Sequence, residues 1–157
     1  MFIKRSNGMA YNSSCNCGVI KYSFEFDPML HFVCHCSTCQ KLFGTSLCAL
    51  TMPEHEIEIE GKMSQHTVTG GSGQDMHYFF CSICSSLIYN KPEVMGGMAY
   101  VLAGAFAEQI EFKPVMELWV GNRPPWMQQS ESIIESFEDN GTIDRIQALL
   151  ENLDQRN

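Results

Sequence analysis

Three cysteines lie within six residues, in the segment Cys34–Cys39. Thiolates are soft ligands, and Zn²⁺ binds them in a tetrahedron. In an extended segment, side chains at positions i and i+2 point the same way, so Cys34 and Cys36 share a face and His35 points to the other. A turn after Cys36 would bring Cys39 to the same ion. Three protein ligands leave a fourth position open, which is typical of a catalytic zinc.

Four further cysteines form two short pairs, Cys15 with Cys17 and Cys81 with Cys84. A C-x-C pair and a distant C-x-x-C pair can close one four-thiolate structural zinc. On spacing alone the ligand sets could be permuted, and Cys48 could join the second metal. Its place in the apolar run Leu47–Leu50 favours a core role instead.

The eight cysteines also bear on location. Residues 1–8 contain two basic residues with no apolar stretch behind them, so no signal peptide is expected, and Met9 is an alternative start. Without a secretion signal, clustered cysteines indicate metal binding in the reducing cytoplasm rather than disulfides. No apolar run approaches the roughly 20 residues that span a bilayer.

Charge restricts the partners. The chain carries ten Lys and Arg against eighteen Asp and Glu, a net charge of −8. Nucleic acids and anionic membranes require a basic surface, so neither is expected as a partner. At 157 residues and 45% hydrophobic composition, one globular core is expected.

The pattern along the chain predicts a mainly β fold of short antiparallel strands, punctuated by Gly and Pro. A helical turn is expected at 40–43, and an amphipathic helix at 142–154 from the spacing of Ile143, Ile146, Leu149, Leu150 and Leu153. Its apolar stripe must cover the domain or a second copy, which makes a homodimer possible. Strands are expected at 19–26, 30–36, 45–52, 56–60, 65–69, 75–80, 87–89, 98–102 and 114–120.

Three motifs together resemble one known family. The segments Ser14–Gly18, Cys34–Lys41 and Phe80–Leu87 are similar to the opening, central and second structural motifs of the glutathione-dependent formaldehyde-activating enzyme family, which includes centromere protein V. The weaker matches are Ala103-Gly104 and Arg123–Trp126. Two serines, Ser13 and Ser85, stand where the family usually has Gly, and Ala105-Phe106-Ala107 replaces its usual Thr-Leu-Asp.

The resemblance implies a β-tent fold closed by a structural zinc, with two zinc ions per chain. By the same match, Cys15, Cys17, Cys81 and Cys84 hold the structural zinc, and Cys34, Cys36 and Cys39 hold the catalytic one. The expected organisation is an N-terminal extension over 1–12, the zinc-binding domain over 13–130, and a linker with the C-terminal helix over 131–157.

Three thiolates on Zn²⁺ give a site of charge −1, which is a poor Lewis acid toward water but accepts a thiol as a further soft ligand. The hypothesis is a carbon–sulfur lyase that adds glutathione, or a similar thiol, reversibly to formaldehyde or another small aldehyde. Lys41 and Arg123 are candidates for binding the carboxylates of glutathione. His35 could act as a base, but a structural or surface role is favoured.

Three rival hypotheses remain. A non-catalytic module with two structural zincs would be favoured by a fourth ligand such as Cys48. Methionine sulfoxide reduction on the same fold needs a free nucleophilic cysteine, and Cys48 is the spare one, in an apolar run that should raise its pKa. DNA binding, as centromere protein V suggests, conflicts with the charge of −8.

Overall fold

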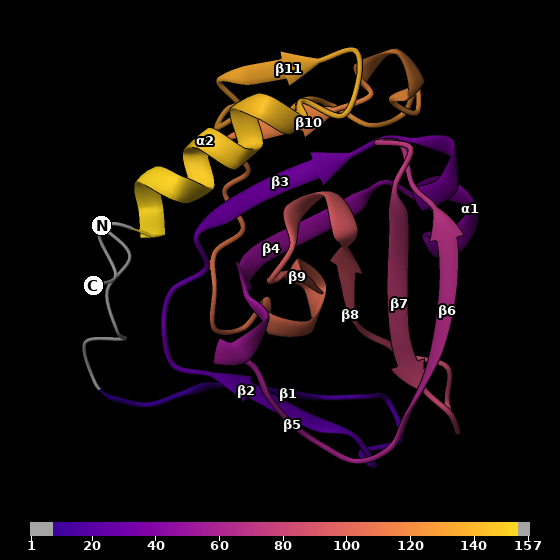
Figure 1. Ribbon diagram of the computed structural model, residues 1–157, viewed down its shortest axis with the longest axis vertical. Helices are drawn as coiled ribbons and strands as arrows, with labels where there is room; N and C mark the ends of the chain where they lie inside the picture. The colour runs from indigo at the N-terminus through magenta and orange to yellow at the C-terminus, as the bar shows by residue number, and fades with distance from the viewer. Residues whose placement is uncertain (1–7, 154–157) are drawn as a thin grey trace.

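The computed structural model describes residues 8–153, and within them the chain forms two β-sheets with a long C-terminal helix (Figure 1). The predicted mainly β fold with a C-terminal helix is confirmed. The smaller sheet consists of β1 (Tyr11–Ser14), β2 (Lys21–Phe24) and β5 (Glu58–Glu60), in the order β1-β2-β5. All its pairings are antiparallel.

The larger sheet has eight strands in the described chain. They are β3 (Leu30–Cys34), β4 (Leu47–Pro53), β6 (Met63–Thr69), β7 (Asp75–Cys81), β8 (Leu87–Pro92), β9 (Met98–Leu102), β10 (Met116–Leu118) and β11 (Glu135–Phe137). Their order in the sheet is β11-β10-β3-β4-β9-β8-β7-β6. Most pairs are antiparallel, as expected, but β10 runs parallel to both β3 and β11. Parallel pairing is possible there because long segments separate these strands in the sequence.

Two α-helices complete the described fold. Helix α1 (Ser37–Phe43) follows β3 directly, and Gly44 ends it with a φ of 72°, a left-handed conformation that glycine adopts without strain. Helix α2 (Thr142–Leu153) crosses the sheet over β3 and β10 (Figure 1). Short 3-10 turns lie at η1 (Glu54–Glu56), η2 (Glu93–Met95), η3 (Ala103–Phe106) and η4 (Val120–Asn122). No helix in residues 8–153 is long and apolar enough to cross a membrane.

The centre of the larger sheet is buried on both faces, which explains why β4 is apolar nearly throughout. Leu50 and Met52 face the core beneath the smaller sheet, whereas Leu47 and Ala49 face a second core beneath α2. Alternation along one strand therefore serves two separate cores.

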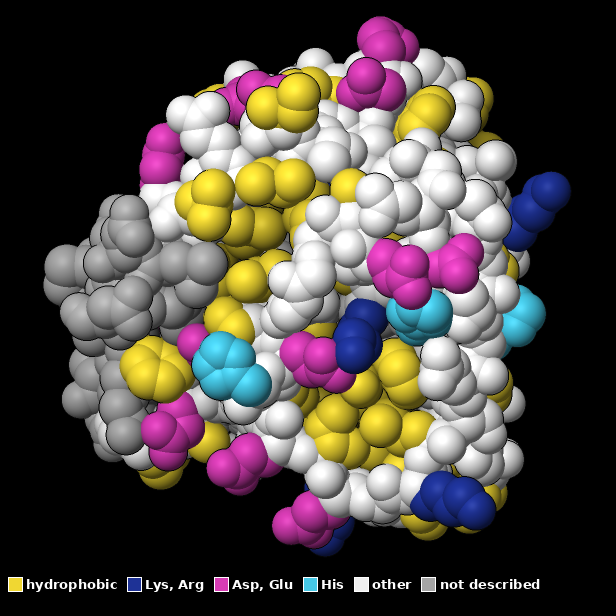
Figure 2. Space-filling view, viewed as in Figure 1, with side chains coloured by type: hydrophobic (Ala, Val, Ile, Leu, Met, Phe, Trp, Pro, Cys, Tyr) yellow, Lys and Arg dark blue, Asp and Glu magenta, His cyan; other side chains and the backbone are white. Residues whose placement is uncertain are grey.

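Helix α2 buries only part of the predicted apolar stripe, since Leu149 and Ile146 pack in the core beneath it. Leu149 is 4% exposed, but Ile143 and Leu150 are 80% and 57% exposed, while Arg145 is buried. Figure 2 shows hydrophobic side chains gathered around α2, and Lys and Arg side chains scattered singly over the same face. The side chain of Leu153 lies outside the described residues.

Candidate functional site

The three-cysteine cluster forms where β3 ends and α1 begins. Cys34 is the last residue of β3, Cys36 is the N-cap of α1, and Cys39 lies in its first turn. The three sulfurs lie within 4.8 Å of one another, as the sequence predicted they would. The backbone N–H of Cys39 donates to Cys36 Sγ over 3.3 Å, so the helix cap is itself a thiol.

These thiols share protons unequally. Hydrogen bonds from the thiols of Cys34 and Cys39 lower the pKa of Cys36 to about 3. The same contacts with Cys36, together with burial, raise the pKa of Cys34 to about 12. The pKa of Cys39 is raised by its contacts with Cys34 and Cys36. The contacts among the three thiols therefore favour the thiolate form of Cys36, and a bound cation would favour that form at all three sulfurs.

His35 points away from the sulfurs, as the alternation predicts, into a buried polar network. Its Nδ1 lies 2.7 Å from Ser46 Oγ and its Nε2 lies 3.0 Å from Glu117 Oε2. Glu117 is fully buried on β10 and accepts further hydrogen bonds from Ser136 Oγ and Arg123. These contacts connect the segment that carries the cysteines to β10 and agree with the structural role favoured for His35.

The two predicted substrate-binding cations lie elsewhere. Arg123 donates through Nε and Nη2 to the carboxylate of Glu117, which occupies its guanidinium. Lys41 is exposed on α1. Neither side chain is among the described residues that line the pocket beside the three cysteines.

That pocket is a small cavity of about 40 Å³, bounded by the three cysteines and by apolar walls such as Phe32, Leu47 and Leu118. Since a water molecule needs roughly 10–15 Å³ by this measure, the space suits a few waters or one small molecule. The polar side chains in its lining include Tyr78, Tyr100, Asn90, Asp75 and Arg145. Sequence reasoning missed Arg145; the available signal was a charge four residues before Leu149, on the buried face of α2.

Tyr78 has a special place in this lining. It is 4% exposed and belongs to the lining that the three cysteines share. Burial, followed by the nearby thiols of Cys39, Cys36 and Cys34, raises the pKa of Tyr78. The phenol therefore stays protonated at neutral pH and is available as a donor.

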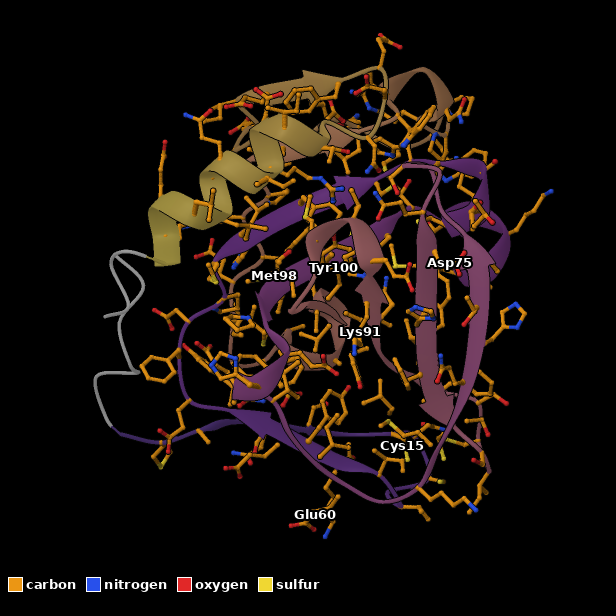
Figure 3. All side chains as sticks on the ribbon, viewed as in Figure 1. Cys15, Glu60, Asp75, Lys91, Met98 and Tyr100 are labelled. Atoms are coloured by element: carbon orange, nitrogen blue, oxygen red, sulfur yellow. The ribbon has the colours of Figure 1, made fainter. Side chains whose placement is uncertain are left out.

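The four-cysteine cluster joins the two sheets. Cys15 and Cys17 follow β1, Cys81 ends β7 and Cys84 follows it, and the four sulfurs lie within 4.8 Å of one another. Figure 3 labels Cys15 where the smaller sheet meets the end of β7. Asp75, at the other end of β7, lines the three-cysteine pocket, so the two clusters lie at opposite ends of one strand.

The geometry of both clusters fits a thiolate-bound metal. Sulfurs about 2.3 Å from a tetrahedral zinc are about 3.8 Å apart. The Sγ atoms of Cys15 and Cys17 are 3.5 Å apart, and those of Cys17 and Cys81 are 3.8 Å apart. Backbone N–H groups of Ile20 and Ile83 donate to the sulfurs of Cys15 and Cys81, as suits a bound thiolate. Two cysteine clusters compatible with zinc are therefore present.

Cys48 belongs to neither cluster. It pairs with Val33 on the neighbouring strand and packs against the core beneath the smaller sheet, whereas Cys34 and Cys39 lie in the core beneath α2. Burial raises the pKa of its thiol. Among the described cysteines, none supplies the three-cysteine cluster with a fourth sulfur.

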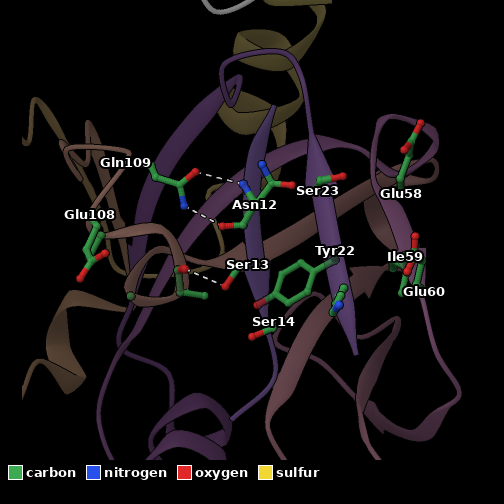
Figure 4. Close-up of a pocket in the computed structure, with 14 residues that line it drawn as sticks. Asn12, Ser13, Ser14, Tyr22, Ser23, Glu58, Ile59, Glu60, Glu108 and Gln109 are labelled. Atoms are coloured by element: carbon green, nitrogen blue, oxygen red, sulfur yellow. Dashed lines mark hydrogen bonds between the residues drawn. The ribbon is translucent and has the colours of Figure 1, made fainter. Parts of the chain in front are cut away.

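A wider hollow of about 960 Å³ lies between the smaller sheet and η3 (Figure 4). Its lining includes Lys21, Glu58, Glu60 and Glu108, and Gln109 bridges to the backbone of Asn12 through both its amide atoms. The described residues that line this hollow include no cysteine.

The chain is similar to a known protein family and to a solved structure. The model of the glutathione-dependent formaldehyde-activating enzyme family matches residues 10–122, a span that contains both cysteine clusters and ends before α2. No curated protein matches the chain. A crystal structure of a Rhodobacter sphaeroides protein from a structural genomics programme is similar, with 17% sequence identity and a TM-score of 0.46, over 64% of this chain and 90% of that chain.

Proposed function

Because this chain belongs to the glutathione-dependent formaldehyde-activating enzyme family, we propose that it is a carbon–sulfur lyase that adds glutathione, or a similar small thiol, reversibly to formaldehyde or another small aldehyde. The observation that carries the proposal is a cluster of three sulfurs beside a small pocket, with no fourth cysteine at hand. We place the reaction in the cytoplasm, where the thiols stay reduced.

Cys34, Cys36 and Cys39 would hold the catalytic zinc, and Cys15, Cys17, Cys81 and Cys84 the structural zinc. When bound at three thiolates, the catalytic ion supplies a position that favours a thiolate over water, because soft donors suit it.

In this proposal the side chains that line the pocket exclude water from the reacting atoms and orient the reactants. Phe32, Leu47 and Leu118 wall the pocket and keep bulk water from the thiolate and the carbonyl group. The thiol releases its proton to solvent, its sulfur bonds to the carbonyl carbon, the carbon–oxygen π bond opens, and the oxygen takes up one proton from an acid that solvent then reprotonates. We propose Tyr78 as that acid, because it lines the pocket and its raised pKa keeps the phenol protonated.

The first experiment measures the rate of hemithioacetal formation from glutathione and formaldehyde with zinc-loaded protein, by exchange NMR. A rate above the uncatalysed background supports the proposal, and Cys48→Ser should keep it while Cys36→Ser abolishes it. If the rate of hemithioacetal formation with fully zinc-loaded protein equals the uncatalysed rate, the proposal is wrong. Native mass spectrometry measures the zinc content, which we expect to be two ions per chain, and shows whether glutathione stays bound.

The role of Tyr78 is tested with Tyr78→Phe. Loss of a general acid lowers rates by about 10²–10⁴-fold, so we expect a fall of about 10²-fold in kcat with the zinc content unchanged. A variant with full activity would remove Tyr78 from the mechanism but leave the cysteines in place.

A further inference from the structure

Helix α2 contributes a buried cation to the three-cysteine pocket. Arg145 is 3% exposed and is the one Lys or Arg among the described residues that line this pocket. Its Nη1 donates to Tyr100 Oη over 3.0 Å, and Tyr100 is labelled at the centre of Figure 3. Arg145 lies beyond the span that the family model matches, so the family alone does not account for it.

Within residues 8–153, Arg145 forms no ion pair with a carboxylate. In residues 8–153 no carboxylate lies within 4.0 Å of its guanidinium, and its Nε is buried without a hydrogen-bond partner. Its Cζ lies 5.2 Å from the centre of the Phe32 ring. Asp75 also lines the pocket but is exposed and does not pair with it. Burying an unpaired guanidinium is costly unless an anion or hydrogen-bond acceptor completes its surroundings.

A second polar group in the same lining is also incomplete. Asn90 is fully buried, donates through Nδ2 to Met76 Sδ over 3.5 Å, and leaves Oδ1 without a partner. Two residues of the pocket lining therefore each hold a buried polar atom without a hydrogen-bond partner in residues 8–153, Nε of Arg145 and Oδ1 of Asn90.

We propose that Arg145 and Asn90 form a carboxylate-binding subsite of the three-cysteine pocket. Because Tyr100 occupies Nη1, the Nε and Nη2 groups remain, and these two parallel donors match the two oxygens of a carboxylate. Asn90 Oδ1 then accepts the hydroxyl of the hemithioacetal. This inference rests on the proposed function and specifies it: one reactant carries a carboxylate close to the reacting carbon or sulfur.

The carboxylate has two possible sources, the aldehyde or the thiol. The cavity of about 40 Å³ suits a small aldehyde acid such as glyoxylate, whereas glutathione would reach Arg145 only through its chain end. The probes are therefore glyoxylate against formaldehyde, and glutathione against cysteamine, which has no carboxylate.

The variants are Arg145→Met, which keeps the length but not the charge, and Arg145→Lys, which keeps the charge but not the two-pronged geometry. Lys62→Met, an exposed charge removal outside this pocket, is the matched control. Binding of each probe to the zinc-loaded proteins is measured by NMR titration. A lost charge-assisted pair weakens binding by about tenfold or more.

If glyoxylate binding weakens at least about tenfold in both Arg145 variants and not in Lys62→Met, the aldehyde supplies the carboxylate. If only glutathione is affected, and cysteamine is not, the thiol supplies it. Equal binding of all four probes to Arg145→Lys and the unmodified protein overturns the proposal. Should Arg145→Met fail to fold, a crystal soaked with glyoxylate decides: a carboxylate away from Nε and Nη2 also overturns it.

The two proposals fail in different ways. Arg145-dependent carboxylate binding without catalysis would overturn the lyase activity but not the subsite. Catalysis with formaldehyde and cysteamine that is equal to that with the acidic reactants, and insensitive to Arg145→Lys, would leave the lyase and remove the subsite.

Discussion

At the scale of single residues, neighbouring side chains around the three thiols point to opposite sides of the chain where β3 ends. Cys34 and Cys36 face the pocket, and His35 between them reaches Glu117. A fully buried carboxylate on β10 thus fixes the loop that carries the sulfurs, while Arg123 and Ser136 complete its hydrogen bonds. Residues that could bind a metal therefore alternate with a residue that contacts the buried carboxylate.

Glu117 should make stability depend on pH. Burial raises the pKa of this carboxyl, but hydrogen bonds from Ser136, His35 and Arg123 outweigh it, and the net pKa is lowered from 4.5. A lowered pKa in the fold means that its stabilisation is complete above pH 4.5 and is lost as the pH falls below it. We expect Glu117→Gln to cost about 2–3 kcal/mol at pH 7, by urea unfolding at matched zinc content. The gap between the two proteins should narrow below pH 4.5, and a gap independent of pH would contradict this account.

Ser85 bears local backbone strain. It follows Cys84 with a φ of 63°, in the left-handed region that disfavours side chains, at a position where the family usually has Gly. Removing the strain gains about 1–2 kcal/mol, and the added freedom of the unfolded chain offsets about 0.4–1 of it. Ser85→Gly should therefore raise the unfolding free energy by about 0.5–1 kcal/mol. Ser82→Gly, in the same turn but without a positive φ, should lower it; equal effects would argue against strain.

At the scale of elements, helix α2 is held to the sheet by few side chains. Leu149→Ala, at a position 4% exposed, should cost about 2–4 kcal/mol because it leaves a cavity beneath the helix. Leu150→Ala, one residue on and 57% exposed, should change stability by less than about 0.5 kcal/mol. Thermal and urea unfolding of the pair measure this. Similar losses for both leucines would place the helix in another rotation on the sheet.

The helices and strands that were predicted correctly are those with a clear apolar pattern or cap in their own sequence. Strand β9 occupies Met98–Leu102 as expected, and α2 starts at Thr142 after Asn140-Gly141. Strands β1 and β11 were missed, since β11 has three residues and forms because β10 offers it an edge. Short strands of this kind depend on partners far away in the sequence rather than on local alternation.

The residues of the site also differ in how well the local sequence predicts them. Both cysteine clusters were predictable because thiol spacing limits which sulfurs can meet, and the structure brings together the expected seven. The pocket's cation was not predictable from the region of the cysteines, since α2 supplies it from more than a hundred residues later in the chain. Lys41 and Arg123 are near in sequence to motif residues, but Glu117 engages Arg123.

At the scale of the whole molecule, the two clusters differ in what they connect. Cys34, Cys36 and Cys39 close only a short loop at one end of β7. The four-cysteine cluster joins Cys17 to Cys81, 64 positions apart, and so ties the smaller sheet to the larger one. Closing a longer loop restricts the unfolded chain more, by about 2 kcal/mol for this difference in length. Metal at the four-cysteine cluster should therefore contribute more to the stability of the molecule.

The different contributions of the two clusters to stability can be compared with one cysteine variant in each. Cys84→Ser and Cys39→Ser each should remove one of two zinc ions by native mass spectrometry, while Cys48→Ser keeps both. Cys84→Ser should lower Tm clearly further than Cys39→Ser, because only the former removes a cross-link between the two sheets. Cys39→Ser should instead lose hemithioacetal formation while keeping most of the stability. If Cys39→Ser proved the less stable of the two, the three-cysteine cluster would be the one that holds the fold, and the assignment of roles would reverse.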